Sequence, residues 1–274
     1  MRAWRGDIRS RGFDLNGAWS PLYNWHKVLA GLLDADRYCG EKTAVDVATR
    51  LGGYIESLFA ELTPAQVQQV LLCEYGGLNE SFAELHARTG QLRWLALSRK
   101  LFDQKVLQPL IEGRDELANL HANTQVPKLI GLHRLYELTG ERDYARAAGF
   151  FWDLVTSRYS YVIGGNADRE YFQAPLSISR HITEQTCESC NTYNMLKLTR
   201  QLYAAHVRHS PAVLLAIRGF LVLRRHRDGE PRTARRLDLL AKAQITVRFE
   251  PEPNVSAGPV FGVRLLTAEA ATGA

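Results

Sequence analysis

The sequence repeats one pattern three times: an apolar helical run, a glycine, and a second helical run. The glycines are Gly40, Gly90 and Gly140, which lie fifty residues apart. Glycine often ends a helix because it adopts a left-handed backbone conformation at no steric cost. Each unit therefore predicts two helices joined by a short turn. The stretch "LKLTRQLYAAHV" predicts a fourth helix near the next position.

Local signals support this all-α prediction. In "SPLYNWHKVLAGLLDADRY" the apolar residues share one helical face. Thr63 and Pro64 are typical of an N-cap followed by the first helical residue, and Pro127 predicts a helix start in "NTQVPKLIGLHRLYELTG". Strand signals are confined to "YSYVIGG" at 159–165 and "AQITVRFEPEP" at 243–253. The sequence thus predicts helical hairpins followed by a short β-rich remnant.

Repeated helical hairpins build either an open solenoid or a closed α/α toroid, and the period alone does not choose between them. Polar and aromatic residues gather where hairpins begin, around His26, around Asn79 and Glu80, and around His121. This placement favours a toroid, in which the helix ends line one pocket. Aromatic rings, amides and imidazoles together suit sugar binding, although a structural role for each histidine is the simpler alternative.

Charge is unevenly placed along the chain. The net charge is +5, but residues 206–236 hold eight arginines against Asp228 and Glu230, a balance of +6, so the rest sums to about −1. This does not make a nucleic-acid footprint, and we expect no nucleic-acid partner. No run approaches the ~18 apolar residues of a membrane span, and the first residues lack the apolar core of a signal peptide. We expect a cytoplasmic protein without membrane contact; its oligomeric state stays open.

The stretch "TCESCNTYNMLKLTRQLY" at 186–203 allows several readings. Thr186 predicts the N-cap of a helix running to Ala205, with Glu188 and Cys190 in its first turn. A helix start favours a carboxylate and lowers the pKa of a thiol, and both groups bind zinc. Glu188 and Cys190 converge only if Glu188 precedes the regular helix, whereas Cys187 and Cys190 converge more easily. A zinc site, a redox pair and buried thiols at a helix start remain alternatives.

A second candidate is the loop "GGNADREYFQAP" at 164–175, where Asp168 and Glu170 are predicted to be exposed beside aromatic residues. A carboxylate in such surroundings can act as a general acid and base. A solvated acidic loop is the alternative. The glycines do not form a phosphate-binding loop, because no Lys-Ser/Thr pair follows them.

These segments, in this order, resemble the β-L-arabinofuranosidase family, glycoside hydrolase family 127. The matching pieces, within residues 14–205, are "LYNWHKVLAGLLDADRYCG", "CEYGGLNESFAELHARTG", "LHANTQVPKLIGLHRLYELTG", "YVIGGNADREYF" and "TCESCNTYNMLKLTR". The resemblance implies an (α/α)6 toroid and retaining hydrolysis of an arabinofuranoside in an arabinose-containing oligosaccharide or glycan.

The resemblance also implies roles for individual residues. Glu170 is similar to the general acid and base of the family, and Glu188 and Cys190 are similar to two of its zinc ligands. The remaining matches lie in the sugar pocket: His26, Asn79, Glu80 and His121.

The sequence departs from the family after the last of these segments. The family takes its nucleophile and last zinc ligand from an adjacent Cys-Cys pair downstream, and this chain has no cysteine after Cys190. We therefore expect an incomplete zinc site, an incomplete toroid and little or no activity. The expected organisation is an N-terminal extension (1–13), a toroid of catalytic type (14–205), an atypical arginine-rich segment (206–240), and a β-sandwich remnant with a tail (241–274).

Two other functions stay open at this point. One is a non-catalytic carbohydrate-binding remnant, and the other is a different α/α-toroid sugar enzyme such as a lyase or epimerase. Zinc content separates a complete glycosidase site from a binding remnant. Substitution of Glu170 separates a glycosidase from a lyase or epimerase, because only protonation of a glycosidic oxygen requires that carboxyl in this role.

Overall fold

The computed structural model describes residues 7–205, 246–251 and 261–266 of the chain. Contacts between backbone atoms divide the chain into two units, Met1–Phe220 and Leu221–Ala274. The predicted arginine-rich segment at 206–240 lies outside the described residues. In the second unit, strands β4 (Thr246–Pro251) and β5 (Phe261–Leu266) pair antiparallel. The strand predicted within 243–253 is thereby confirmed.

The first unit is helical apart from a small antiparallel sheet at its start, in which β2 lies between β1 and β3. The elements are β1 (Ser10–Arg11), β2 (Asp14–Leu15), β3 (Ala18–Trp19), α1 (Pro21–Cys39), α2 (Thr43–Ala60), α3 (Pro64–Val70), α4 (Leu78–Thr89), α5 (Leu92–Lys100), α6 (Gln104–Ile111), α7 (Ala122–Thr139), α8 (Arg142–Leu154), the π-turn η1 (Val155–Tyr159), the 3₁₀ turn η2 (Ile178–Arg180) and α9 (Ser189–Ala205). No helix in the described part is long and apolar enough to cross a membrane.

The three glycines end helices as the repeat predicts. Gly40, Gly90 and Gly140 have φ values of 73°, 70° and 75° and follow α1, α4 and α7 directly. Each is the turn of a hairpin, so the hairpins are α1/α2, α4/α5 and α7/α8. The predicted cap at Thr63 is also confirmed: its hydroxyl accepts from the amide of Gln66, whose side chain in turn accepts from the amide of Thr63.

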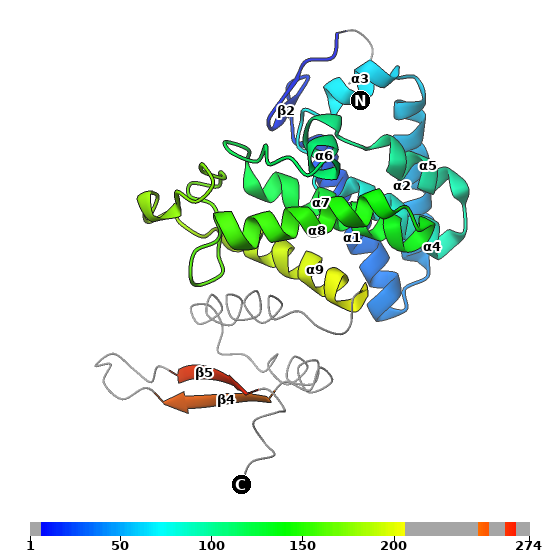
Figure 1. The fold of residues 1–274 in the computed structure, drawn as a ribbon. Coiled ribbons are helices and arrows are strands. Elements are labelled where there is room, and N and C mark those ends of the chain that lie inside the picture. Colours follow the sequence, from blue (N-terminus) through cyan, green and yellow to red (C-terminus); the bar gives the residue numbers. More distant parts are fainter. Residues whose placement is uncertain (1–6, 206–245, 252–260, 267–274) are drawn as a thin grey trace. The chain divides into compact units, whose positions relative to one another are not determined.

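The hairpins are arranged as part of an α/α toroid (Figure 1). Helix α1 packs on α4, α4 on α7, and α7 on α9, which makes an inner row in sequence order. Helices α2, α5 and α8 each pack on the inner helix of their own hairpin. Within the described residues the result is an incomplete all-α toroid, as the sequence predicts.

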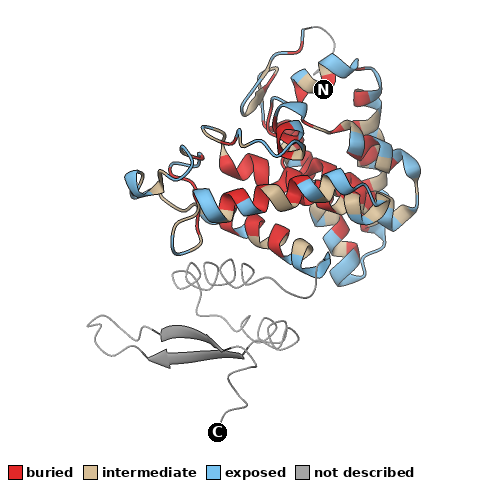
Figure 2. Ribbon diagram, in the orientation of Figure 1, coloured by how far each residue is buried: buried red, intermediate tan, exposed pale blue. Residues whose placement is uncertain are grey.

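Helix α7 lies at the centre of this arrangement (Figure 2). Its residues from Ala122 to His133 are all buried, because α4, α8 and α9 cover it from different sides. One apolar cluster joins α7, α8 and α9, and a second joins α1, α2, α4 and α5, where Trp94 stacks on Phe82 at 5.9 Å between ring centroids. A helix held on so many sides provides a rigid base for the polar residues at its start.

Two predicted helix starts are wrong. Helix α7 begins at Ala122 with His121 as its N-cap, so Pro127 lies inside the helix rather than in its first turn. Helix α9 begins at Ser189, and Thr186 does not cap it. The hydroxyl of Thr186 instead donates to the carboxylate of Asp168 at 3.1 Å, because the loop before α9 folds back on that residue.

The strand predicted at 159–165 is wrong as well. The segment begins at the end of the π-turn η1, and its only ladder contact is an isolated bridge between Ser160 and Asn166. A hydrogen-bonded turn at Tyr161 and Gly164 closes the loop between them. The apolar β-branched residues of this segment lie in a turn and not in a strand, and Val162 is almost fully exposed there.

Candidate active site

His26 lies in the second turn of α1 against the glycine pair that precedes α4. Its Nδ1 accepts a hydrogen bond from the Gly77 amide at 3.1 Å. A Cβ on Gly76 would lie 2.6 Å from that same nitrogen, so only glycine permits this approach. Burial, followed by the charges of Lys27 and Lys197, lowers the pKa of His26 to about 3. The ring is therefore neutral, and its proton lies on Nε2.

Glu80 is next to His26 on the first turn of α4. A Cβ on Gly77 would lie 3.0 Å from His26 Nε2 and 3.3 Å from Glu80 Oε2, so the two side chains flank one backbone position. The Glu80 carboxylate also binds Lys197 Nζ of α9 at 3.2 Å. Burial raises the pKa of Glu80, and Lys197 opposes that rise. The pair ties the first turn of α4 to α9.

Asn79 faces a different neighbour. It is 1% exposed, and its side-chain amide donates to the carbonyl of Lys128 in α7 at 3.0 Å. Gly131 makes room for it, because a Cβ there would lie 2.3 Å from Asn79 Cγ. The side chain joins α4 to α7, and it is not part of the cluster around His26.

Glu170 and His121 form the second polar pair. Glu170 Oε2 lies 3.3 Å from His121 Nε2, and the Glu170 side chain is 56% exposed whereas that of His121 is 14% exposed. The His121 ring is held edge-on by Phe13 and Tyr171, at 5.1 and 5.3 Å between ring centroids. The carboxyl faces solvent while the imidazole behind it is fixed.

The loop that carries Glu170 is tied to α7 and to the segment before α9. The Glu170 carbonyl accepts from the Ala122 amide at 2.8 Å, and Arg169 donates to the carbonyl of Gln185 at 3.1 Å. Glu170 itself has a φ of 70°. Asp168 was predicted to be exposed, and this is wrong: it is 4% exposed because it accepts the hydroxyls of the segment before α9. Glu170 is exposed as predicted.

Glu188 and Cys190 lie at the start of α9 in the arrangement that allows them to converge. Glu188 comes just before the first helical residue, and its carboxylate is close enough to the Cys190 thiol to raise the pKa of that thiol. The Cys190 side chain is exposed, yet partial desolvation raises its pKa to about 11; the neighbouring Glu188 carboxylate adds to this rise, and Lys27 opposes it. The expectation that the helix start lowers this pKa is wrong, because partial desolvation and the Glu188 carboxylate outweigh the helix dipole.

The donor chemistry of this pair fits a zinc ion in part. Glu188 Oε2 is buried with no hydrogen-bond partner, and a carboxylate beside a thiol is a donor pair that zinc accepts. No group of three His, Cys, Asp or Glu side chains suited to a metal occurs in the described part of the chain. Two donors are fewer than the four of a usual zinc site. Cys187 packs on Gly165 instead, where an added Cβ would lie 2.7 Å from its Sγ.

Tyr23 of α1 connects these groups. Burial and then Glu74 raise the pKa of Tyr23, and Cys190 and Glu188 add to the rise. The phenol is close enough to the Asn123 side chain for that side chain to oppose the rise in its pKa, and the Asn123 oxygen accepts from the Asn194 amide at 2.7 Å. The starts of α1, α7 and α9 therefore meet at one end of the inner row.

Comparison with known proteins identifies a family over the helical part of the chain. A family profile described as the β-L-arabinofuranosidase GH127 catalytic domain matches residues 2–212. The chain belongs to this family. No curated protein matches the sequence.

Solved structures agree with the fold of this GH127 chain. A GH127 β-arabinofuranosidase matches with a TM-score of 0.56 at 18% identity, over 73% of this chain and 32% of that one. A structure described as a glycoside hydrolase matches at 0.58 and 16%, over 73% and 37%. A GH127 β-L-arabinofuranosidase from Geobacillus stearothermophilus T6 matches at 0.56 and 17%, over 73% and 35%. The chain spans about a third of the length of these proteins.

Sequence reasoning missed several polar residues that the GH127 fold brings to this end. Glu74 lies inside the quoted "CEYGGLNES" segment, and its place before a glycine pair was the available signal. Thr124 lies one helical turn after His121, a spacing at which helical side chains meet. Lys27 and Lys197 gave no signal, because isolated lysines on a helix are usually solvated.

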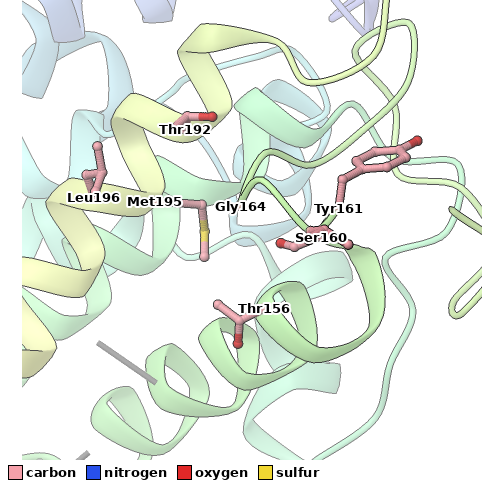
Figure 3. Close-up of a pocket in the computed structure, with 8 residues that line it drawn as sticks. Thr156, Ser160, Tyr161, Gly164, Thr192, Met195 and Leu196 are labelled. Carbon is pink, nitrogen blue, oxygen red and sulfur yellow. The ribbon is translucent and has the colours of Figure 1, made fainter. Parts of the chain in front are cut away.

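Two hollows adjoin the inner helices. A cavity of about 150 Å³ lies between η1, the loop after it and α9, and Figure 3 shows Met195 and Thr156 at its sides. It contains none of the predicted site residues. A larger hollow of about 640 Å³ lies between α1, α4, α7 and α9, and Glu80, Lys197 and Tyr193 line it. Glu80 is the one predicted site residue on its wall.

Proposed function

We propose that this GH127 chain carries the sugar-binding and acid/base part of a retaining β-L-arabinofuranosidase site. The observation that carries the proposal is the pair of Glu170 and His121, an exposed carboxyl 3.3 Å from a fixed imidazole, at the helix ends of the family's catalytic domain. Glu170 would protonate the leaving oxygen and later deprotonate water. Its partner is an arabinose-containing oligosaccharide or glycan.

Several of the proposed site residues suit a small polyhydroxyl ligand. The neutral His26 has Nε2–H free to donate to a hydroxyl, and Glu80 beside it can accept from one. Tyr171 is 41% exposed next to His121, so its ring can lie against the C–H face of a sugar. Asn79 would act from behind, by fixing α4 on α7.

We propose Glu188 and Cys190 as two of the zinc ligands. Zinc, when bound, would hold a cysteine as thiolate at neutral pH, which is the chemistry a thiol nucleophile needs. The printed sequence has no cysteine after Cys190, so the nucleophile that the family resemblance implies is missing from it. We therefore expect this chain to bind an arabinofuranoside and to hydrolyse it little or not at all.

Calorimetry of the purified 274-residue chain with methyl β-L-arabinofuranoside tests the binding part. We expect measurable binding that falls at least tenfold in His26→Ala, where a hydroxyl loses its donor. His86→Ala is the matched control, because His86 lies at the far end of α4. Methyl α-L-arabinofuranoside and methyl β-D-glucopyranoside test selectivity. Equal affinity for all three sugars, or no binding, would contradict the proposal.

Release of 4-nitrophenol from 4-nitrophenyl β-L-arabinofuranoside tests the catalytic part. We expect a trace rate that Glu170→Gln lowers further, together with well under one equivalent of zinc. Fast turnover would show that a nucleophile is present in this chain. Binding of sugar with no effect of Glu170→Gln on any reaction would favour the non-catalytic carbohydrate-binding alternative, which the two-donor metal set also favours.

A further inference from the structure

Glu74 is a buried carboxyl that the proposed chemistry does not use. It lies between α3 and α4 and is 8% exposed. Its Oε1 lies 3.2 Å from Thr124 Oγ1, and its Oε2 lies 3.5 Å from Ser20 Oγ. Its amide donates to the carbonyl of Gly12 at 2.7 Å, which fixes the backbone at this point. A carboxyl this deep with hydroxyl partners calls for a reason, because burying one is costly.

A line of polar contacts leads from Glu74 to the exposed carboxyl of Glu170. Thr124 Oγ1, which contacts Glu74, lies 2.7 Å from His121 Nδ1. His121 Nε2 lies 3.3 Å from Glu170 Oε2. The line crosses from the segment before α4, through the first turn of α7, to the loop after α8. The two carboxyls therefore act on opposite sides of one imidazole.

The N-cap bond of α7 shows which nitrogen of His121 carries the proton in this structure. The Thr124 amide donates to His121 Nδ1 at 3.3 Å, which is the N-cap bond of the helix. A backbone amide is always a donor, so Nδ1 is the acceptor and has no proton. In the neutral ring the proton is then on Nε2, from which it points at Glu170.

The direction of the Thr124 hydroxyl proton determines whether Glu74 must carry a proton. Because Nδ1 is bare, the 2.7 Å contact from Thr124 Oγ1 requires the hydroxyl proton to point at the ring. The hydroxyl has one proton, so its contact with Glu74 Oε1 requires a proton from the carboxyl. All three contacts, from the Thr124 amide to Nδ1, from Thr124 Oγ1 to Nδ1 and between Thr124 Oγ1 and Glu74, are hydrogen bonds at once only when Glu74 is protonated.

The surroundings of Glu74 agree with a protonated carboxyl. Burial raises the pKa of Glu74, while His121, Thr124, Ser20 and Lys128 oppose the rise. The charge of Lys128 is already engaged, since its Nζ binds Asp103 Oδ2 at 2.7 Å. Tyr23 and Cys73 also lie within electrostatic range of Glu74. Deprotonation of either one would add a negative charge and favour the neutral carboxyl further.

We propose that Glu74 is a positioning residue, which holds His121 through Thr124 as the Nε2–H tautomer. His121 then donates to Glu170 Oε2, and the proton that Glu170 transfers is confined to its other oxygen, Oε1. If Glu74 ionises, Thr124 Oγ1 donates to it instead, and the 2.7 Å contact with His121 then requires a proton on Nδ1. The longer 3.3 Å bond from the Thr124 amide to Nδ1 breaks in that state, and Nε2 no longer donates. The consequence for catalysis rests on the proposed function; the tautomer does not.

Nuclear magnetic resonance of the full chain with ¹⁵N-labelled histidine tests the proposal without sugar or turnover. Long-range ¹H–¹⁵N correlations distinguish the two tautomers, and loss of a signal set in His121→Gln assigns His121 among the eight histidines. At neutral pH we expect the Nε2–H tautomer. As the pH rises and Glu74 ionises, we expect conversion to the Nδ1–H tautomer.

Variants show whether Glu74 controls the His121 tautomer through Thr124 (a relay) or only makes a structural contact. In Glu74→Gln the amide still donates to Thr124 and cannot ionise, so His121 should remain Nε2–H at every pH at which its ring is neutral. Thr124→Val should abolish the conversion, and Thr124→Ser should keep it, because serine retains the hydroxyl. Signals of the other histidines report whether each variant is folded.

The outcomes decide the proposal in either direction. An Nδ1–H tautomer at neutral pH would overturn it, as would the same pH response in the wild type and in Glu74→Gln. A relay confirmed in a chain that binds no arabinofuranoside would leave the tautomer assignment standing and refute only the proposed function.

Discussion

The helical frame (21–154) and the site loop (160–188) hold their functional residues in opposite ways. In the frame the residues that end hairpins in a left-handed conformation are glycines. In the site loop five residues with side chains adopt that conformation, out of eight in the described part: Ala167, Arg169, Glu170, Leu176 and Cys187. Each costs about 1–3 kcal/mol, so the loop persists because neighbouring contacts determine it.

The difference separates two tasks. The frame fixes His26, Glu74 and His121 by packing, and none of them can move without disturbing a helix start. The loop carries Glu170 over His121 with a backbone that is strained and a side chain that is exposed. Substitutions should therefore be costly in the frame through lost packing and charge pairing, and mild in the loop.

The largest effect is expected at the buried ion pair of the frame. Lys128 and Asp103 side chains are 3% and 8% exposed and lie 2.7 Å apart. Lys128→Met leaves Asp103 buried without its partner, which should lower the free energy of unfolding by about 3–5 kcal/mol. Urea unfolding measures this. The double variant with Asp103→Asn should recover most of the loss, and a loss below 1 kcal/mol in Lys128→Met would show that the frame tolerates an unpaired charge.

A second test of the frame uses pH. The pKa of His26 is lowered from 6.5 to about 3, so between these values the unfolded chain binds a proton that the native one does not. Stability due to His26 is complete above pH 6.5 and is lost as the pH falls, by about 1.36 kcal/mol per unit. At pH 4.5 the wild type should have lost about 3 kcal/mol that His26→Gln does not lose. Chemical unfolding at pH 7 and 4.5 compares them.

His86→Gln serves as the control for this titration, since His86 lies at the end of α4 and is not fully buried. Groups that titrate in both proteins cancel in the difference. Parallel pH profiles for wild type and His26→Gln would contradict the assignment of a buried neutral imidazole.

Two glycines compare the regions directly. A Cβ on Gly131 would lie 2.3 Å from Asn79 Cγ, and a Cβ on Gly165 would lie 2.5 Å from Cys187 Cβ. Gly131→Ala should cost about 1–3 kcal/mol, because helices α4 and α7 cannot separate. Gly165→Ala should cost less, because the loop can shift. Thermal unfolding of both variants decides, and an equal or larger cost at Gly165 would show that the loop is as closely constrained as the frame.

The same contrast explains what could be predicted from sequence. The glycine period predicted the hairpins, because a helix and its end are local and depend on few residues. It could not place Pro127 inside α7, since tertiary packing of a buried helix outweighs the local preference of proline for a first turn. The pKa of Cys190 was also out of reach, because it depends on partial desolvation and on Glu188, not on the helix start alone.

The site residues also differ in whether local sequence or only tertiary structure reveals them. His26 and His121 were predicted because each lies near the start of a hairpin, at similar places in the repeat. Glu74 could not be predicted as a site residue, because nothing in the local sequence marks a carboxyl as buried. Its line to Glu170 joins segments that are far apart in sequence. Only the folded chain brings them together.

The smallest effect is expected when glycine, the residue that adopts the left-handed conformation at the hairpin turns of the frame, replaces Glu170 in the loop. Glu170 has a φ of 70°, the same value as Gly90. Glu170→Gly should therefore be more stable than Glu170→Ala by about 1 kcal/mol, because only alanine retains the steric cost of this conformation. Both variants lose the contact between Glu170 and His121. This contact contributes little to stability, because the Glu170 side chain is exposed. Gly90→Ala is the mirror control and should lose about the same amount. If thermal unfolding finds glycine and alanine equal at position 170, then the loop relaxes around Glu170, and its backbone does not hold the carboxyl in place.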